Sequence, residues 1–485
     1  MKKKVVSIAL LCALLASVGC GSSDGGADTP TGTTAPSGSD AATTQPEETS
    51  EFQAVDVKYS DRDFIIAEND IGDWMQSAFI TEENGDVLND SIYKRNTIVE
   101  DLYGVNLKGH KIEGNRNRQD LASIKNSILA GDKDFDIAYI PGQLCKNILS
   151  DPQYLIPLSD VATLDLSHSW WAQNSVEEMT FGGKTISATG DMIVTTTGST
   201  TVTFFNKTLA EQYNLDIYNI VREGKFTLDY VYNTGKTVSA DLNGDTKRDA
   251  DNDRFGLIVE SLNIMHTVNT AGEKLITKDS EGYPVCNVGS SAIVDIVQKY
   301  VSIIDDKDNV ISVQDNRISD GGPAAVFNSD RAMFWYTNLQ RMKAARSFDA
   351  EFGLVPLPKY DESDEYVGPV GGYWDSWLMI PATQDDTDYV GNVVEALGYY
   401  SQQYVTPAFI ETSVTTKTLR DDDSAEMLEI VLANRSFDAG MYFGWGYDQL
   451  IGTAVDHNPN FASLIAADKS KIDASIAEFV NNFKD

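Results

Sequence analysis

The feature that most constrains the fold is an alternation of apolar runs with helix-like segments between Lys58 and Gln143. Three short apolar runs have the composition of buried strands: 63–70, 105–112 and 134–143. Two segments between them, 89–104 and 119–131, place apolar side chains at helical spacing and end at a glycine. Strands that alternate with helices predict an α/β fold with a parallel sheet.

The same alternation continues through the rest of the chain, with a strand predicted at 201–205 and a helix at 225–240. A chain of 485 residues exceeds one ordinary hydrophobic core, so we expect two domains. In a parallel sheet, ligands bind beyond the carboxyl ends of the strands. The loop Pro141–Gln143 therefore faces a candidate site.

The charge balance is strongly acidic, with 73 Asp and Glu against 38 Lys and Arg and a formal net charge of -35. Nucleic-acid binding needs a basic surface that displaces counterions, so this balance argues against it. It also argues against docking on anionic lipid through a charged face. Two interpretations stay open: a neutral or cationic small-molecule ligand, or simply a soluble, self-repelling exterior.

The N-terminus resembles a bacterial lipoprotein signal. Three lysines precede the apolar run VVSIALLCALLA, and Gly19 stands directly before Cys20. We expect residues 1–19 to be a signal peptide and Cys20 to carry the lipid. The residues from Gly21 to Glu51 include no aromatic residue and no Leu, Ile or Val, so 20–53 is predicted to be a disordered tether. The alternative is an ordinary secretory leader that contains a cysteine.

Two further cysteines, Cys145 and Cys286, lie after the tether. They allow either one disulfide or two separate buried thiols. The sequence does not decide between these alternatives.

Six segments after the tether follow one another in a characteristic order: ENGDVLNDSIYKRNTIVEDLYGV, FDIAYIPGQ, DLSHSWWAQNSVEEMTFGGK, VTFFNKTLAEQYNL with GKFTLD, EFGLVPLPKYDE, and SWLMIPATQDDTDYVGNVVEALGYYSQQYVTPAF. In this order, behind a lipoprotein leader, they resemble the extracellular solute-binding proteins of ABC importers, in the group that includes oligosaccharide binders. The resemblance covers nearly everything after the tether. It specifies the group and leaves the ligand open.

The resemblance implies a two-lobe α/β fold of the type II periplasmic-binding-protein kind, with a hinge and an interlobe cleft. Lobe one would comprise 54–190 and 373–430, and lobe two 191–372 and 431–485. A carbohydrate would bind between the lobes, and closure would present it to the permease subunits of the importer. The implied location is the extracellular side of the plasma membrane, with the lipid as anchor.

The segment DLNGDTKRDADNDRFG, from Asp241 to Gly256, concentrates oxygen-bearing side chains. Its spacing approaches that of an EF-hand loop and predicts a structural Ca²⁺ site formed by Asp241, Asn243, Asp245, Lys247 (through its carbonyl), Asp249 and Asp253. Thr246 stands where glycine normally permits the sharp turn, and the closing acid is displaced by one residue. Related solute-binding proteins often carry a similar loop. The alternative is a solvated acidic turn.

Aromatic side chains in polar or glycine-rich settings are the candidate ligand contacts, because flat rings pack on the apolar faces of sugars. With one carboxylate that accepts hydrogen bonds, the candidates are Trp170, Trp171, Trp335, Tyr373, Trp374, Asp375, Trp377 and Trp445. For each ring the alternative is packing in the core.

No catalytic function is predicted. The sequence contains no H-E-x-x-H, no G-x-G-x-x-G and no P-loop, and its four histidines are scattered without ligand spacing. Two alternatives stay open: a secreted glycoside hydrolase with paired carboxylates, and a solute-binding protein for a ligand other than sugar. Hydrolysis of a chromogenic oligosaccharide would favour the enzyme, whereas saturable binding without turnover would favour the importer subunit.

Overall fold

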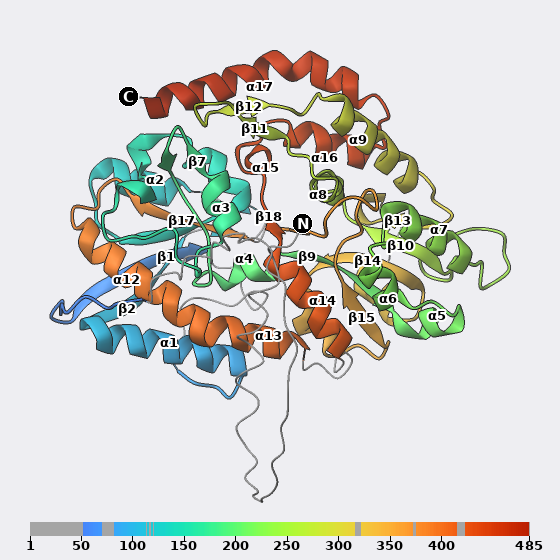
Figure 1. Ribbon diagram of the computed structural model, residues 1–485, viewed down its shortest axis with the longest axis horizontal. Helices are drawn as coiled ribbons and strands as arrows, with labels where there is room; N and C mark the ends of the chain where they lie inside the picture. Colours follow the sequence, from blue (N-terminus) through green and yellow to red (C-terminus); the bar gives the residue numbers. More distant parts are fainter. Residues whose placement is uncertain are drawn as a thin grey trace, which may run out of the picture. The chain divides into compact units, whose positions relative to one another are not determined.

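The computed structural model describes residues 52–69, 82–112, 121–315, 322–371, 375–414 and 422–484, with the short strands β3 (Gly114–Asn115) and β4 (Arg118–Gln119). These residues fall in one compact unit, Thr49–Asp485, which contains two five-stranded sheets (Figure 1). The predicted signal peptide, Cys20 and nearly all of the predicted tether lie outside the described residues. In the part of the chain that is described, no helix is long and apolar enough to cross a membrane.

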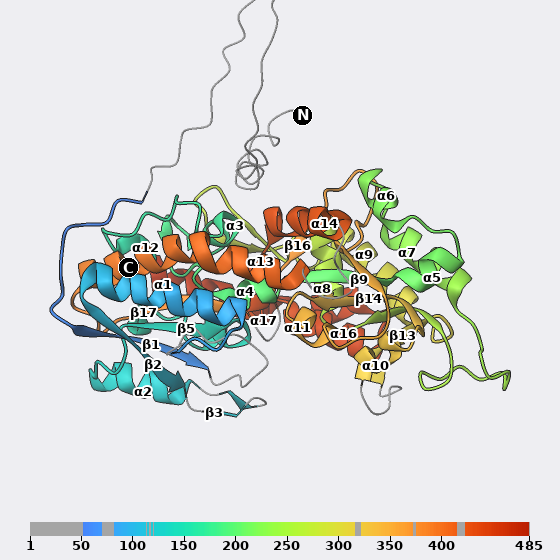
Figure 2. The same cartoon turned by 90° about the horizontal axis from the view of Figure 1, so that it is seen from below.

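The first sheet has the strand order β2 (Val105–Ile112), β1 (Arg62–Asn69), β5 (Ile137–Pro141), β17 (Ser376–Pro381) and β6 (Leu155–Ile156). β1 pairs in parallel with β2 and β5, whereas β17 pairs antiparallel with β5. Helices α1 (Val87–Tyr103) and α12 (Thr387–Tyr400) lie on one side of this sheet, and α2 (Ala122–Ala130) lies on the other (Figure 2).

Side-chain alternation along the first sheet fills both faces. Phe64 and Ile66 of β1 join one buried cluster with Val99 of α1, and the neighbouring Ala67 joins the other with Ile124 of α2. β5 is buried along its whole length, as expected for a strand covered on both faces. The predicted strands and helices of this region are confirmed.

The second sheet has the strand order β13 (Val310–Ser312), β10 (Phe255–Val259), β14 (Ala332–Asn338), β9 (Thr201–Asn206) and β15 (Phe352–Val355). β10 pairs in parallel with β13 and β14, while β9 pairs antiparallel with β14 and β15. Both sheets are therefore mixed. The strands predicted at 63–70, 105–112 and 134–143 are parallel to one another, as expected, and β17 adds an antiparallel neighbour. The chain comes from the first sheet into the second at β9, and it returns to the first sheet at β17. In each sheet this entering strand is antiparallel to its neighbours.

Helices α5 (Lys207–Gln212), α6 (Ile217–Arg222), α7 (Leu228–Val238), α8 (Asn263–Thr270) and α9 (Ser291–Ile304) follow the strands of the second sheet. α7 approaches β10 closely because glycines meet at the contact. A Cβ on Gly256 would come 2.3 Å from Cα of Gly235.

Helix α14 (Asp422–Ala433) contacts β15 of the second sheet, and its Glu426 pairs with Arg222 of α6 at 2.6 Å. The predicted division between the lobes at residue 430 falls inside this helix. The lobe boundaries stay a prediction.

The remaining elements are connections and C-terminal helices. The last of the six segments quoted above contributes α12, a π-helical turn η8 (Ser401–Val405) and the start of α13 (Thr406–Val414). The chain ends with α15 (Ala439–Phe443), α16 (Tyr447–Asp456) and α17 (Phe461–Lys484). Further short helices are η4 (Gly142–Asn147), η5 (Pro152–Tyr154), η6 (Leu158–Asp160), η7 (Val313–Asp315), α10 (Gly322–Asn328) and α11 (Arg341–Ala345). Cys145 and Cys286 are separate free thiols.

Candidate functional site

Three segments of the described chain join the two sheets. We call them the crossover and define them by residues 186–201, 368–376 and 434–438. The first segment bridges β17 at Ala188 and then runs through α4 (Val194–Gly198) into β9. The second contains β16 (Gly368–Pro369) and leads into β17, and the third contains β18 (Arg435–Ser436), which pairs with β16. A bridge between Thr200 and Val370 joins the first two segments.

Hydrogen bonds fix the first two crossover segments to each other. The hydroxyl of Thr196 accepts from the backbone N–H of Ser376 at 3.2 Å and donates to the Ser376 carbonyl at 2.8 Å. Thr189 donates to the same hydroxyl at 2.9 Å. Thr196 is buried, so these bonds are shielded from water and hold β17 in register with α4.

Asp375 is fully buried where β17 begins, beside the carboxyl end of β5. Its carbonyl accepts from the backbone N–H of Gly142 at 2.9 Å, and its Oδ2 accepts from the indole N–H of Trp377 at 3.1 Å. Burial raises the pKa of Asp375 to about 7, against the opposing effect of the Tyr442 hydroxyl and the Trp377 indole. The structure thus brings together the predicted Pro141–Gln143 loop and the predicted residues Asp375 and Trp377.

Four more polar residues lie at the crossover edge of the second sheet. Thr195 and Thr200 lie on the first crossover segment, and Asn338 and Gln340 lie at the end of β14. Backbone bonds hold the two stretches together: Leu339 N–H to the Thr200 carbonyl at 3.0 Å, and Gln340 N–H to the Gly198 carbonyl at 2.8 Å.

These side chains carry buried oxygens that find no hydrogen-bond partner among the described residues: Thr195 Oγ1, Thr200 Oγ1, Asn338 Oδ1, Gln340 Oε1 and, across the crossover, Asp375 Oδ1. A buried polar atom without a partner costs on the order of 1–3 kcal/mol. Five of them lie on segments that come together in one region, and we therefore take this region as the candidate place for a polar solute that donates hydrogen bonds. The sequence analysis did not single out Thr195, Thr200, Asn338 or Gln340. A signal was available for Asn338, because it stands at the end of a strand, as Pro141 does.

The predicted tryptophans lie in packed surroundings. Trp170 stacks on His168 with ring centroids 4.0 Å apart, and the Trp171 indole donates to Glu395 Oε1 at 3.2 Å. Trp335 packs against Phe204 and Phe327 inside the second sheet's core. Each of these three tryptophans is at most 3% exposed.

Trp377 and Trp445 are buried as well. Trp377 packs edge-on against Tyr442, with ring centroids 4.6 Å apart, at the crossover. Trp445 stacks on Phe443 at 4.7 Å, and its indole donates to Ser475 of α17 at 3.2 Å. Tyr373 and Trp374 lie outside the described residues. Ligand contact by the predicted aromatic residues stays a prediction.

The acidic loop is held by its own backbone. Asp241 accepts from Gly244 N–H at 2.7 Å and Thr246 N–H at 2.8 Å, and Asn243 and Asp245 accept from the N–H two residues further on. Asp249 accepts from two backbone N–H groups, and the buried Asp253 accepts from Leu242 N–H and from the N–H of Asp249. Among the described residues no three acidic, His or Cys side chains converge as a metal site would require. With its oxygens turned toward backbone N–H groups, the loop is not arranged to coordinate an ion. Calcium binding by the predicted ligands, which include the Lys247 carbonyl, stays a prediction.

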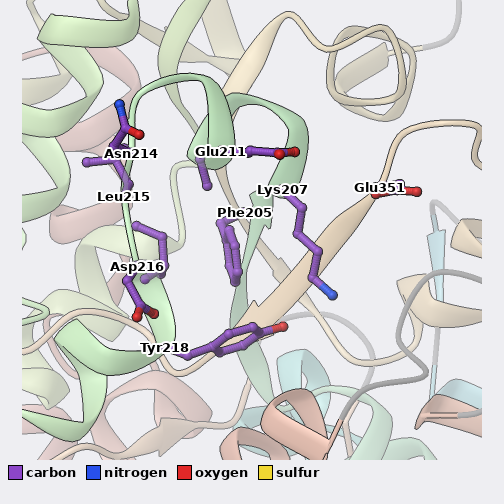
Figure 3. A pocket seen from close by; sticks show the side chains of 10 residues that line it. Phe205, Lys207, Glu211, Asn214, Leu215, Asp216, Tyr218 and Glu351 are labelled. Carbon is purple, nitrogen blue, oxygen red and sulfur yellow. The ribbon is translucent and has the colours of Figure 1, made fainter.

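A separate pocket of about 540 Å³ lies beside α5 and the start of α6 (Figure 3). Phe205 and Tyr218 lie at its centre, with Glu211, Asp216 and Glu351 around them. The two rings are only 3% and 9% exposed, so they offer little face for stacking. No predicted ligand residue lines this pocket, and we place the candidate site at the crossover.

Comparison with protein-family models finds no match, and comparison with curated proteins finds none either. Solved structures, in contrast, match over most of the chain. An ABC substrate-binding protein from Listeria monocytogenes in complex with cycloalternan has a TM-score of 0.56 at 10% identity, covering 86% of this chain and 99% of that one. The cyclic α-maltosyl-1,6-maltose binding protein from Arthrobacter globiformis has a TM-score of 0.55 at 14% identity, covering 86% and 99%.

An ABC transporter solute-binding protein from Thermotoga lettingae, bound with α-D-tagatose, has a TM-score of 0.53 at 14% identity and covers 86% of this chain and 100% of that one. These identities are low, so the matches concern the fold. They confirm the two-lobe α/β fold of ABC solute-binding proteins.

Proposed function

We propose that this protein is the substrate-binding subunit of an ABC importer, which binds a carbohydrate between two lobes and delivers it unaltered to a membrane permease. The observation that carries the proposal is a set of five partnerless buried oxygens in a solute-binding fold: three on the crossover segments, at Thr195, Thr200 and Asp375, and two beside them at the end of β14, at Asn338 and Gln340. The structures with this fold that are described above include complexes with cycloalternan and with α-D-tagatose.

The chemistry of these oxygens favours a solute rich in hydrogen-bond donors. Asn338 Oδ1 and Gln340 Oε1 accept hydrogen bonds, and the Thr195 and Thr200 hydroxyls both accept and donate. Sugar hydroxyls match this pattern, and they carry no charge that the acidic protein would repel. A solute that bridges both edges of the crossover would favour the closed arrangement of the lobes, because it gains contacts with both.

A thermal-shift screen tests the ligand class. Mono- and oligosaccharides, peptides and other polar metabolites are added to the purified chain, and the change in Tm is measured. We expect a saturable rise in Tm with at least one carbohydrate. A rise with a peptide alone would replace the sugar by the alternative, a solute-binding protein for a ligand other than sugar.

The alternative of a secreted glycoside hydrolase is tested with a chromogenic oligosaccharide. We expect no release of the chromophore at an oligosaccharide concentration that saturates the protein. Release that disappears on heating the protein would establish hydrolysis and overturn the importer assignment.

We further propose that Cys20 carries a lipid that anchors the protein to the extracellular side of the plasma membrane. The basis is the sequence before and after Cys20. Cys20→Ser, expressed in a Gram-positive host, is expected to release the protein into the medium, whereas the wild type stays in the membrane fraction. Membrane retention of the variant would contradict lipid anchoring.

We also retain calcium as a structural ligand of the loop from Asp241 to Asp253, as its EF-hand-like spacing suggests. Binding requires the carboxylates to turn from backbone N–H groups toward a common centre. The test is the Tm with added Ca²⁺ and with chelator. A rise with Ca²⁺ that chelator reverses is expected, and an unchanged Tm would leave the loop as a solvated acidic turn.

A further inference from the structure

A hairpin from the second-sheet chain reaches across to the first-sheet side. β11 (Ile276–Lys278) and β12 (Pro284–Cys286) follow α8, yet Gly282 accepts at its carbonyl from Gly182 N–H at 3.2 Å. Gly182 joins β7 (Thr180–Phe181) to β8 (Lys184–Thr185), and Thr185 N–H donates to Ser159 beside β6. The hairpin therefore spans the crossover.

Three side chains meet at the base of this hairpin. Lys274 Nζ forms an ion pair with Glu178 Oε2 at the end of α3 (Gln173–Glu178). Glu178 Oε1 accepts from Ala439 N–H at 2.7 Å, and Asp438 Oδ2 accepts from Leu275 N–H at 2.7 Å. One cluster thus joins α3, the hairpin and the third crossover segment.

The cluster holds two buried carboxylates and one lysine. Glu178 is 3% exposed and Asp438 is 1% exposed. The other charged groups around them are Glu177 and Lys278, whose ammonium donates to the Glu177 carbonyl, and the Tyr442 hydroxyl interacts with Glu178. With both carboxylates ionised, one negative charge stays without a counter-charge of its own, and burial makes that arrangement costly.

The titration of Asp438 follows from this arrangement. Burial, and then the charge of Glu178, raise the pKa of Asp438 to about 7. Burial lowers the pKa of Lys274, but the negative charges of Glu178 and Asp438 outweigh this effect. The pKa of Lys274 is therefore raised overall, and the lysine stays charged. Because the pKa of Asp438 in the docked cluster lies above its ordinary value, the docked state is favoured at low pH. That advantage is lost as the pH rises through about 7.

We propose that Glu178, Lys274 and Asp438 form a pH-dependent latch that holds the β11–β12 hairpin across the crossover and so regulates solute binding at the candidate site. The latch itself stands on the contacts above. A hairpin that is fixed on both sides resists relative motion of the two sheets, and in this way the latch would affect solute binding. This second step rests on the proposed function.

Hydrogen exchange of the full chain without solute tests the latch. Amide protection in the segment 274–287 is measured at about pH 5.5 and about pH 8 and corrected for intrinsic exchange. Linkage between an ordinary Asp pKa and one of about 7 predicts roughly 30-fold weaker protection at the higher pH. In Asp438→Asn the change is expected to fall below about threefold, because the titrating group is gone.

Two further variants keep the test sharp. Asp448→Asn removes an exposed acid that pairs with Lys146 at 3.7 Å, and it is expected to keep the full pH response. Lys274→Met leaves both carboxylates without their ammonium and is expected to weaken protection of the hairpin most at the higher pH. Protection of the wild type that does not change with pH would overturn the latch, as would an Asp438→Asn variant that keeps the wild-type response.

Regulation is measured separately, as the Kd of the best solute at the two pH values. We expect the wild-type Kd to depend on pH more strongly than that of Asp438→Asn. Equal dependence would overturn the regulatory role and leave the latch standing. The exchange experiment contains no solute, so failure of the proposed function leaves its result unchanged.

Discussion

The carboxylate of Asp375 lies directly over Gly142: a Cβ added to Gly142 would come 2.5 Å from Oδ1 of Asp375. The same two residues are joined by the backbone bond from Gly142 N–H to the Asp375 carbonyl at 2.9 Å. The end of β5 and the start of β17 therefore fit together only because residue 142 has no side chain. This contact fixes where the second crossover segment enters the first sheet.

Gly142→Ala is expected to destabilise the protein, because the new methyl group must displace a buried carboxylate. Overpacking of this kind costs about 1–3 kcal/mol. Urea unfolding measures the loss in free energy of unfolding. Gly452→Ala is the matched control: no atom lies within 4 Å of its added Cβ, and the change in α16 is expected to be neutral or stabilising.

Asn338→Leu is expected to separate binding from stability. The substitution removes a buried oxygen that has no partner in the protein, so the free energy of unfolding should hold or rise. If the solute donates to that oxygen, its Kd should rise by about 10- to 100-fold. Calorimetry and urea unfolding on the same preparations check both. A loss of stability together with an unchanged Kd would place Asn338 outside the solute site.

Asp375→Asn is expected to change the pH dependence of stability. Burial raises the pKa of Asp375 to about 7, so its contribution to stability is present at low pH and is lost as the pH rises through about 7. Relative to the variant, the wild type should lose stability across that range, as measured by urea unfolding at several pH values. In the exposed control Asp385→Asn no difference from the wild type should develop near pH 7. Because the hydrogen bond from Lys133 lowers the pKa of Asp385, its effect has the opposite sign and is confined to pH values below about 4.

Thr246→Gly is expected to stabilise the acidic loop. Thr246 has a φ of 65°, in the left-handed region that a β-branched residue rarely adopts. Relief of this strain, less the entropy cost of glycine, should add about 1 kcal/mol to the free energy of unfolding. Thr237→Gly, on the exposed side of α7, is the control and should instead lower the free energy of unfolding by roughly a few tenths of a kcal/mol. A destabilised Thr246→Gly would show that the hydroxyl or methyl group matters more than the backbone.

The sequence predicted the elements well where local rules decide. Gly104 and Gly131 adopt left-handed conformations, with φ of 61° and 78°, and end α1 and α2 at the predicted places. Thr246 takes the left-handed turn that its position in the loop pattern requires, even without glycine. These features depend on short spacings that can be read directly.

The candidate site depends on contacts between distant segments, and there sequence reasoning was weaker. Trp171 and Trp335 are conspicuous in the sequence, yet both are buried, with Glu395 and Phe204 as neighbours. Thr200 and Asn338 are inconspicuous, and their stretches of chain lie side by side only because β9 and β14 pair antiparallel, with Thr201 opposite Asn338. Local periodicity does not specify that pairing, so it could not be predicted.

The most direct test of the proposed function is isothermal titration calorimetry of the purified chain against a panel of carbohydrates. The account predicts, for at least one sugar, injection heats that saturate at one site and return to baseline. A heat that continues until the sugar is consumed, or no heat with any carbohydrate in the panel, would contradict a receptor that binds a sugar and releases it unchanged.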